Sequence, residues 1–572
     1  MGKTLRKLRT ISQVHFTLIA LFAMLFLIPI GAGFWVTLRA SFGVLPAIGA
    51  SEFGFQNWLG ILATPGIWKS TITTVFVGFL STLISTWLAL ASCRWVIEKS
   101  GKSILSRLIN PILAVPHAAM AIGFAFMISP SGSIARAISP ILTGWEQPPI
   151  ITTTNDIVGL SLSLGLIIKE FPFLLLLSLS AYYQLPVSAQ RQVTRTLGHS
   201  DHTLWRFVFY PQIIKKITLP IVIVFCYSLS AVEMAIILGP TNPPTLSVFA
   251  LRMFNSPDSS NIMLACAISI LLAGLTIVGI WICQKLIRIY LIKIASNVEN
   301  GRFKQGQKIN QSAPRLVASL LVFFGIGSLL LLLTWSFTWR WSFPNIFPET
   351  LSFKIWQKHQ SGAFSLMGVS LLIAVTSAMC CISFVLVWLE TFTSHSRIQA
   401  LFGAVIFLPL LLPQISFLFG FSIISDILGT GAELAKVVIA HSLFVLPYTF
   451  LTLVKSWRDI PIGIINSART LGAGKWRVFF KIKLPILLGP IATCFAIAIA
   501  VSFAQFLPTL FAGNGRVETL TTEAISLSSG SDRRLSAIYG SLLAAPPLVF
   551  FVISVYLPRW IYRNRKQMLG TS

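Results

Sequence analysis

The sequence predicts an all-α integral membrane protein with about twelve transmembrane helices in two parallel six-helix repeats. Of its 572 residues, 55% are hydrophobic and only 11% are charged, and the mean hydropathy is +0.80. A soluble protein of this size needs roughly a quarter of its residues charged to cover its surface. The composition therefore excludes soluble, disordered and coiled-coil proteins.

Twelve apolar stretches are long enough to cross a bilayer, which takes about 20 helical residues. They lie near 14–38, 71–93, 106–128, 157–182, 217–239 and 263–284 in the first half, and near 315–338, 365–389, 399–423, 435–455, 486–510 and 537–560 in the second. The first stretch is too long for the apolar core of a signal peptide, so we expect it to be retained. We expect the spans to tolerate the prolines within them, namely Pro116, Pro172, Pro413 and Pro447.

The net charge of +27 first suggests a nucleic-acid partner, but the basic residues follow a membrane topology instead. With the N-terminus placed in the cytoplasm, the cytoplasmic segments hold 32 of the 44 Lys and Arg, and the outer loops hold 11. Of the 17 acidic residues, five lie inside and ten outside. The positive-inside rule explains this asymmetry. We predict that both termini are cytoplasmic and that no nucleic acid is bound.

The two halves repeat one another. Pro172 and Pro186 recur 275 positions later as Pro447 and Pro461. The run Arg195-Thr196-Leu197-Gly198 recurs 274 positions later as Arg469-Thr470-Leu471-Gly472, and Pro211 recurs at the same offset as Pro485. Pro116 and Gly123 recur 297 positions later as Pro413 and Gly420. Six spans per repeat is an even number, so both halves face the same way. We predict a first transmembrane domain over 1–290, a basic cytoplasmic linker over 291–314 and a second transmembrane domain over 315–572.

The loop after the fourth span of each half is the most closely repeated segment, at residues 185–211 and 460–485. In each copy a short helix is expected to end at Gly198 or Gly472, where glycine takes the left-handed conformation of a helix C′ position. A second short amphipathic segment follows, with Trp205 or Phe479 on its apolar side, and a proline precedes the next span. Two short helices at an angle suit docking into a groove on a partner.

This spacing resembles the EAA loop of ABC-importer permeases, in which a Gly is followed by an aromatic seven residues on and a Pro thirteen residues on. The glutamate of the E-A-A triplet is replaced by an amide in both copies, Gln192 and Asn466. The runs Ser230–Pro244 and Val501–Arg534 extend the resemblance to fused two-domain permeases of the YnjC type, which are related to thiamine and iron(III) permeases. The resemblance covers nearly the whole chain and implies a type I (MetI-like) permease fold in the bacterial cytoplasmic (inner) membrane.

In that family the loop contains the coupling helix, which sits in a cleft of a cytoplasmic ATPase subunit. The resemblance carries this role onto Arg195, Leu197, Gly198, Trp205 and Pro211, and onto Arg469, Leu471, Gly472, Phe479 and Pro485. It implies two copies of an ABC ATPase subunit, which would hold the ATP and magnesium, and an outer solute-binding protein. The alternative is a basic interfacial loop held by anionic membrane lipid.

Four polar residues within or near the spans are candidates for a translocation path. Glu233 lies in the fifth predicted span, Lys169 and Glu170 lie mid-way along the fourth, and Gln505 is close to the second-half equivalent of Glu233. Ionisable groups inside a membrane are costly, so a functional role is the default hypothesis. The alternative is a structural ion pair between Lys169 and Glu233 without substrate contact.

Other kinds of site find no support in the sequence. The seven cysteines show no CxxC spacing and the seven histidines no metal-ligand spacing, so we predict no metal site and no cofactor in this chain. There is no phosphate-binding GxxxxGK[ST] motif and no catalytic cluster, so we do not expect an enzyme. The principal alternative is a secondary active transporter of the twelve-helix type. The transported solute, whether thiamine, ferric iron, a polyamine or another small molecule, is left open.

Overall fold

The computed structural model describes residues 13–98, 111–139, 141–301, 312–392, 396–429 and 431–563. Within these residues, ten helices are long and apolar enough to cross a membrane, and two sharply bent helix pairs raise the number to twelve if each pair is one span. Apart from one short β-hairpin, all regular structure in the described part of the chain is helical. The predicted all-α membrane fold is therefore confirmed.

The spans of the first half are α2 (Gln13–Phe22) with the π-helical turn η1 (Ala23–Leu27) and α3 (Ile28–Ser41), α5 (Ile67–Glu98), α7 (His117–Ile128) with α8 (Ser133–Ile138), α9 (Leu160–Tyr183), α11 (Asp201–Leu204) with η3 (Trp205–Phe209) and α12 (Tyr210–Ser230), and α15 (Ser260–Glu299). Those of the second half are α16 (Ser312–Ser336), α17 (Lys354–Thr391), α18 (Ser396–Val405) with α19 (Leu408–Leu411) and α20 (Ile415–Ile427), α21 (Glu433–Arg458), α23 (Lys475–Val478) with η4 (Phe479–Lys483), α24 (Leu484–Ile486) and α25 (Leu488–Phe503), and α28 (Arg533–Ile561). The shorter elements are η2 (Pro46–Ile48), α4 (Gln56–Ala63), α10 (Val187–Thr196), α13 (Glu233–Leu238), α14 (Leu246–Phe254), β1 (Thr338–Arg340), β2 (Thr350–Leu351), α22 (Ile462–Thr470), α26 (Leu507–Ala512) and α27 (Leu520–Ser528).

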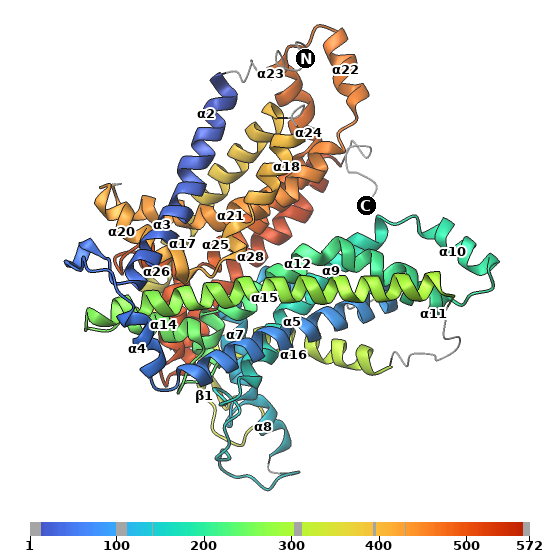
Figure 1. Ribbon diagram of the computed structural model, residues 1–572. Helices are drawn as coiled ribbons and strands as arrows, with labels where there is room; N and C mark the ends of the chain where they lie inside the picture. Colours follow the sequence, from blue (N-terminus) through green and yellow to red (C-terminus); the bar gives the residue numbers. More distant parts are fainter. Residues whose placement is uncertain are drawn as a thin grey trace.

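The spans form two arms that meet at one end and diverge toward the other (Figure 1). One arm contains α5, α9, α12 and α15, and the other contains α17, α21, α25 and α28. The first helix of each half crosses to the opposite arm. Phe22 of α2 packs against Trp388 and Phe402 of the second half, with ring centroids 5.7 and 4.6 Å apart, while α16 packs against α7. Neither half is therefore a self-contained bundle.

Two glycines that the repeat pairs with one another make these crossings possible. A Cβ atom on Gly420 of α20 would lie 2.0 Å from the carbonyl oxygen of Gly33 on α3. A Cβ atom on Gly123 of α7 would lie 2.3 Å from the carbonyl oxygen of Ser328 on α16. Only a residue without a side chain allows two membrane helices to approach this closely.

The prolines of the repeat behave in two ways. Pro172 and Pro447 lie inside the continuous helices α9 and α21, as expected. Pro116 and Pro413 do not: the chain leaves the helix at each of them, and in the second half the two parts of the span are bent by 98°. Proline lacks an N–H and clashes with the preceding turn, so a helix readily ends there.

The fifth and eleventh spans end earlier than predicted. The prediction over 217–239 is wrong at its outer end, because α12 stops at Ser230 and α13 follows separately; likewise α25 stops at Phe503 before α26. Each break leaves a carbonyl group without its helical partner. The Ser247 hydroxyl donates to the Ala231 carbonyl (3.0 Å), and the equivalent Thr521 hydroxyl donates to the Phe503 carbonyl (2.7 Å). Satisfying that carbonyl makes a broken span stable at membrane depth.

The predicted domain boundary at residue 290 lies within α15, which continues to Glu299. Residues 302–311 of the predicted linker lie outside the described residues. The extra residues around 129–156 include α8, and Arg136 of this helix donates to the carbonyls of Trp341, Ser342 and Asn345 at the β-hairpin of the other half. This contact ties the two halves together at the end where the arms meet.

Candidate functional site

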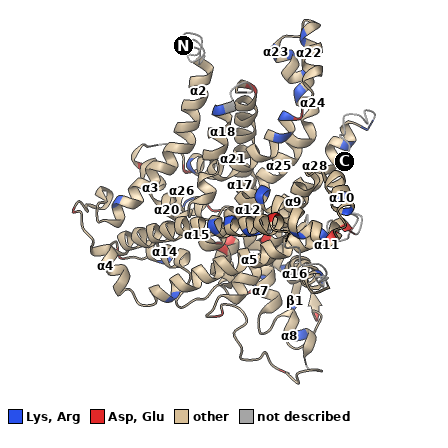
Figure 2. Cartoon of the chain, turned by 45° about the vertical axis from the view of Figure 1, so that its right-hand side comes forward, with Lys and Arg blue, Asp and Glu red and all other residues tan. Residues whose placement is uncertain are grey.

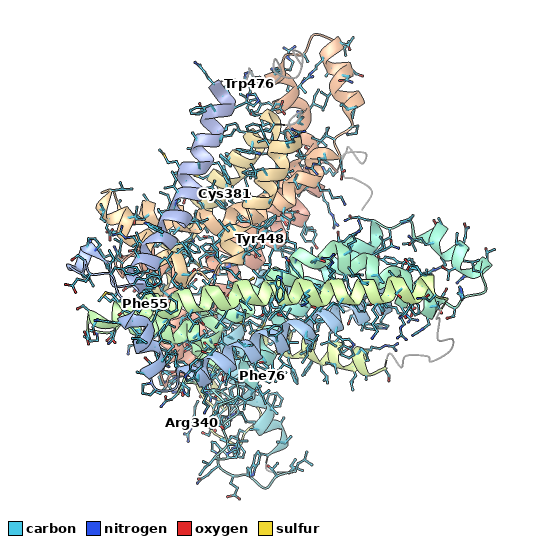
Figure 3. The ribbon with its side chains drawn as sticks, viewed as in Figure 1. Phe55, Phe76, Arg340, Cys381, Tyr448 and Trp476 are labelled. Atoms are coloured by element: carbon cyan, nitrogen blue, oxygen red, sulfur yellow. The ribbon has the colours of Figure 1, made fainter. Side chains whose placement is uncertain are left out.

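A cavity of about 490 Å³ lies between the two arms and is lined by both halves. The four polar residues singled out in the sequence, Lys169, Glu170, Glu233 and Gln505, all line it. Each is buried, with no more than 8% of its surface exposed. Figure 3 places Tyr448, another lining residue, where the two arms come together. The fold thus gathers these polar groups around one space.

Lys169 does not pair with Glu233, so the structural ion pair considered as an alternative is not present. The Lys169 ammonium donates instead to the backbone carbonyls of Ile112, Leu113 and Val115. These carbonyls end the helical turn before Pro116, where the break leaves them without N–H partners. Lys169 therefore stabilises the broken third span from the neighbouring helix.

The two carboxylates belong to a connected polar row on the first-half wall. The Nε2 atom of His117 lies 3.3 Å from Oε1 of Glu170, and the His117 ring packs on the Tyr227 ring with centroids 4.6 Å apart. The Tyr227 hydroxyl in turn donates to Oε1 of Glu233 at 2.8 Å. Each carboxylate thus has a polar neighbour, while both still face the cavity.

The second-half wall is less charged. Gln505, at the break between α25 and α26, donates from Nε2 to the Val501 carbonyl at 3.2 Å. Its Oε1 atom is buried and has no hydrogen-bond partner among the described residues. A buried amide oxygen without a partner is uncommon in folded proteins, which makes Gln505 a notable member of this wall.

Sequence reasoning missed several residues that line the cavity from both halves, although the repeated prolines could have located them. His117 and Gln414 each follow the proline at which the third span of their half breaks, and both line the cavity. Phe173 and Tyr448 each follow the proline within the fourth span, and both line it too. The position after the repeated proline of the third and fourth spans therefore lines the space between the arms.

The two repeated loops lie at the tips of the arms, far from one another (Figure 1). Helices α10 and α22 end as predicted, with Gly198 at φ +73° and Gly472 at φ +80°. The amide of His199 donates to the Thr194 carbonyl, and the amide of Ala473 donates to the Ala468 carbonyl, both at 3.0 Å. Each of these bonds joins residues five positions apart, as in the Schellman motif that ends a helix.

The segment after each glycine differs in part from the prediction. In the first half it is the beginning of the long helix Asp201–Ser230 rather than a separate short helix, and in the second a 71° bend separates Lys475–Ile486 from α25. Both copies contain a π-helical turn, over Trp205–Phe209 and Phe479–Lys483. Pro211 and Pro485 each lie in the first turn of the helix that follows, as the repeat suggests.

The aromatic residue of each loop anchors it to the arm. Trp205 is 1% exposed and stacks on Tyr182 with ring centroids 5.3 Å apart. Phe479 is partly buried and lies 6.3 Å from Trp457, which occupies the position equivalent to Tyr182. Burying such rings fixes the orientation of each loop.

The outward side of each loop is apolar and basic. Leu197 is 67% exposed and Leu471 is 88% exposed, and Arg195 and Arg469 are exposed beside them. Figure 2 shows Lys and Arg positions, coloured blue on the ribbon, around α22, α23 and α24 at the tip of the second arm. Figure 3 places the exposed Trp476 at the same tip. Large apolar side chains left in solvent at equivalent positions are typical of an interaction surface.

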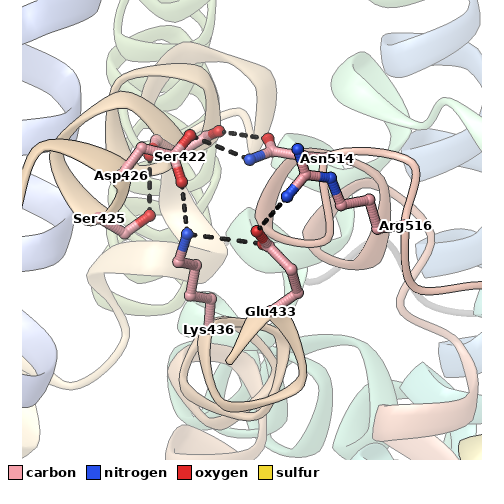
Figure 4. A network of polar contacts seen from close by, with 7 residues as sticks. All are labelled: Ser422, Ser425, Asp426, Glu433, Lys436, Asn514 and Arg516. Atoms are coloured by element: carbon pink, nitrogen blue, oxygen red, sulfur yellow. Dashed lines mark hydrogen bonds and ion pairs between the residues drawn. The ribbon is translucent and has the colours of Figure 1, made fainter. Parts of the chain in front are cut away.

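The opposite end of the second half is held by a polar network (Figure 4). Lys436 of α21 pairs with Asp426 of α20 and, at 3.5 Å, with Glu433. Asn514 donates to Asp426 at 2.9 Å, and Arg516 lies 3.3 Å from Glu433. The network joins the ends of α20 and α21 to the loop after α26.

The part of the chain that the structure describes contains no group of three or more His, Cys, Asp and Glu side chains that could hold a metal ion. All seven cysteines are free thiols, and five of them are buried. The polar residues that line the cavity carry carboxylate, ammonium, amide, imidazole, phenol and hydroxyl groups among mostly apolar neighbours.

Comparison with known proteins connects these features to transport. Residues 387–567 match the family described as the binding-protein-dependent transport system inner membrane component. The inner membrane ABC transporter permease protein YnjC of Escherichia coli (strain K12) is 27% identical over 450 residues, which cover 79% of this chain and 80% of that protein. The molybdenum transport system permease protein ModB of the same strain is 29% identical over 143 residues, covering 24% of this chain and 59% of that protein. A spermidine/putrescine transport system permease protein PotC homolog of Mycoplasma genitalium is 25% identical over 133 residues, covering 23% and 46%. The likeness to YnjC is long enough to include both halves.

Proposed function

Since this chain is a transmembrane permease subunit of the binding-protein-dependent ABC importer type, we propose that it forms the translocation path between its two arms and is driven by separate ATPase subunits that dock on its two repeated loops. ATP hydrolysis then belongs to the partner, and the chain itself is a transport subunit. An outer solute-binding protein delivers the solute. The basic arm tips and both termini face the cytoplasm, in accord with the positive-inside rule.

The observation that carries this proposal is the relation between the cavity and the loops. One space is lined by both arms, and each arm ends in one copy of the same loop, held to the arm by Trp205 or Phe479. A partner that moves the two tips relative to one another changes the opening of the space between them. Shifting such a two-state equilibrium from 1:99 to 99:1 takes about 5.5 kcal/mol of differential binding.

Two equivalent contacts supply the docking sites. Leu197 and Leu471 present the same apolar side chain to solvent at the same place in each loop, next to Arg195 and Arg469. One ATPase subunit on each loop matches this duplication. Burying an exposed Leu contributes about 1.5–3 kcal/mol at each contact.

Along the path, Glu170, Glu233 and Gln505 are the groups placed to meet the solute. The two carboxylates line the cavity from the first half, and Gln505 lines it from the second. Lys169 has a different role, because its ammonium is occupied by backbone carbonyls. It positions the wall on which His117 and Glu170 lie.

Co-purification tests the docking. The tagged permease is expressed with its cytoplasmic ATPase subunit, extracted in mild detergent and captured, and the bound ATPase is quantified. Leu197→Asp and Leu471→Asp are each expected to reduce ATPase capture at least tenfold. The control is Leu428→Asp, which changes a leucine of similar exposure (69%) at the opposite end of the second half. Normal ATPase capture by a Leu197→Asp, Leu471→Asp double variant contradicts the proposed docking sites.

Reconstitution separates an importer from the secondary transporter considered above. Permease, ATPase subunit and binding protein are placed in proteoliposomes, and solute-dependent ATP hydrolysis is measured. An importer requires all three components. Solute accumulation driven by a proton gradient without the ATPase subunit overturns the proposal.

A further inference from the structure

A second cavity lies away from the translocation path, on the first arm. It is a groove of about 450 Å³ lined by α5, α12, α15 and the beginning of α16. Its lining is largely apolar from Phe79 and Phe225 at one end, and it ends at Arg94, Tyr210 and Tyr290. Leu83 and Trp87, which also line it, are 70% and 54% exposed, so the groove is open along the face of the arm.

The length of the groove matches one leaflet of a bilayer. Phe79 and Arg94 lie fifteen positions apart on the same helix, a rise of about 22 Å at 1.5 Å per residue. Half of a hydrocarbon core of about 30 Å together with its headgroup region has a similar length. On the proposed topology Arg94 lies near the cytoplasmic end of α5, so the groove spans the inner leaflet with its polar end at the headgroups.

Arg94 is a cation with spare donors at that polar end. Its Nε donates to Oε1 of Glu98 one turn later at 2.7 Å, and its guanidinium lies 6.0 Å from the ring centroid of Trp205. The side chain is only 13% exposed. Its two terminal nitrogens have no hydrogen-bond partner among the described residues, so a guanidinium fork faces the groove with donors to spare.

The second half shows what occupies the equivalent place there. The amide of Leu246 donates to Thr74, and the equivalent amide of Leu520 donates to Ser370, both at 2.9 Å, which makes Thr74 and Ser370 equivalent. The same spacing along these helices makes Arg94 equivalent to Glu390. Glu390 forms an ion pair with Lys483, whose ammonium lies 4.7 Å from the Trp457 ring centroid.

This comparison shows an asymmetry beneath the two loops. In the second half, a carboxylate on the second span of the repeat meets a cation on the fifth span. In the first half, the second span carries the cation Arg94, and the residue equivalent to Lys483 is Phe209, which brings no carboxylate to it. The ion pair joins two different spans in the second half, whereas in the first half the carboxylate partner of Arg94 is Glu98 on the same helix, and it contacts only the Nε of the guanidinium.

We propose that the groove binds one anionic phospholipid of the inner leaflet, with an acyl chain along Phe79, Leu83 and Trp87 and the phosphate on Arg94. Tyr210 and Tyr290 offer hydroxyl groups at the same depth. Since Arg94 and Tyr210 both pack against Trp205, the bound headgroup supports the first coupling loop from below. The lipid thereby completes in the first half the contact that Glu390 and Lys483 make in the second. This binding site does not depend on the proposed transport function.

Native mass spectrometry of the full-length protein in mild detergent tests the site. Phosphatidylglycerol, phosphatidylethanolamine and diacylglycerol with identical acyl chains are titrated in turn. Phosphatidylglycerol is expected to bind about fivefold more tightly than phosphatidylethanolamine, the factor that one basic side chain near an anionic lipid supplies. Diacylglycerol, which lacks a phosphate, is expected to bind more weakly than either.

Three variants separate the parts of the site. Arg94→Gln is expected to remove the preference for phosphatidylglycerol. Ala91→Phe fills the groove beside Arg94 and is expected to weaken the binding of both phospholipids. Arg458→Gln removes an arginine from the equivalent end of the second arm and is expected to leave the preference unchanged. Equal binding of the two phospholipids to the unmodified protein overturns the proposal, as does an Arg94→Gln protein that prefers phosphatidylglycerol as strongly as the control.

Discussion

Gly420→Ala tests whether the crossing of α3 over α20 holds the two halves together. The added Cβ would lie 2.0 Å from the Gly33 carbonyl oxygen, 2.8 Å from its carbonyl carbon and 3.0 Å from its Cα. Ordinary contacts begin near 3.4 Å, so the two helices must separate by about 1.4 Å. Overpacking of this kind costs about 1–3 kcal/mol, and the obstacle here is backbone, which has no rotamer to change. We therefore expect a loss near the upper end of that range.

The assay is the thermal unfolding of the purified protein in detergent, followed by tryptophan fluorescence. Gly274→Ala is the matched control, because Gly274 lies within the spanning helix α15 and a Cβ there meets nothing within 4 Å. Alanine has the higher helix propensity, so the control is expected to be as stable as the unmodified protein or slightly more stable. Gly123→Ala, at the equivalent crossing, is expected to resemble Gly420→Ala. A Gly420→Ala protein as stable as the Gly274→Ala control would refute the close crossing.

Three further changes test other parts of the structure. Trp205→Ala removes a fully buried ring that stacks on Tyr182, and we expect it to reduce the local stability of the loop by about 3–5 kcal/mol. Limited proteolysis is expected to cleave the loop 185–211 faster in this variant. Glu233→Gln keeps an acceptor for the Tyr227 hydroxyl, so we expect normal expression with reduced solute-dependent ATP hydrolysis; unchanged hydrolysis removes Glu233 from the path. Burial tends to raise the pKa of Asp156, but hydrogen bonds from Ser161, Leu160 and Gly159 hold that pKa below its usual value. Its carboxylate therefore stabilises the fold above the pKa of an unfolded aspartate, about 3.9, and loses this effect as the pH falls through the folded-state pKa. Asp156→Asn is expected to lower the unfolding temperature at pH 7, and a difference from the unmodified protein that does not shrink toward pH 3 would contradict this role.

The repeat predicted more of the site than any single motif did. The spacing of Arg195–Gly198 and Arg469–Gly472 located both loops, and the left-handed glycines follow from the need to end a helix there. The same repeat paired Gly123 with Gly420, and both turned out to be helix crossings. Local conformational requirements of this kind are written into the sequence because only certain residues satisfy them.

The breaks in the spans were not predictable in the same way. Hydropathy treats Glu233 and Gln505 as lying inside continuous spans, but each lies at a break where a hydroxyl from a later helix donates to the carbonyl in place of the missing amide. The ammonium of Lys169 likewise supplies the donors for the break at Pro116. A broken helix is stable in a membrane only when such a partner is nearby, and its presence depends on how different helices pack against one another.

The sequence by itself determined the all-α membrane fold with ten to twelve spans and the position of the two loops, because each depends on local hydropathy or backbone conformation. Only the tertiary structure decided that the first span of each half crosses to the other arm, and that Glu170, Glu233 and Gln505 face one cavity while Lys169 is held by backbone carbonyls. It alone showed that Arg94 lies beside an open groove where the second half has an ion pair. The physical reason is that burial and pairing of polar groups depend on which helices meet, and the apolar stretches of a membrane protein are too alike to specify their neighbours.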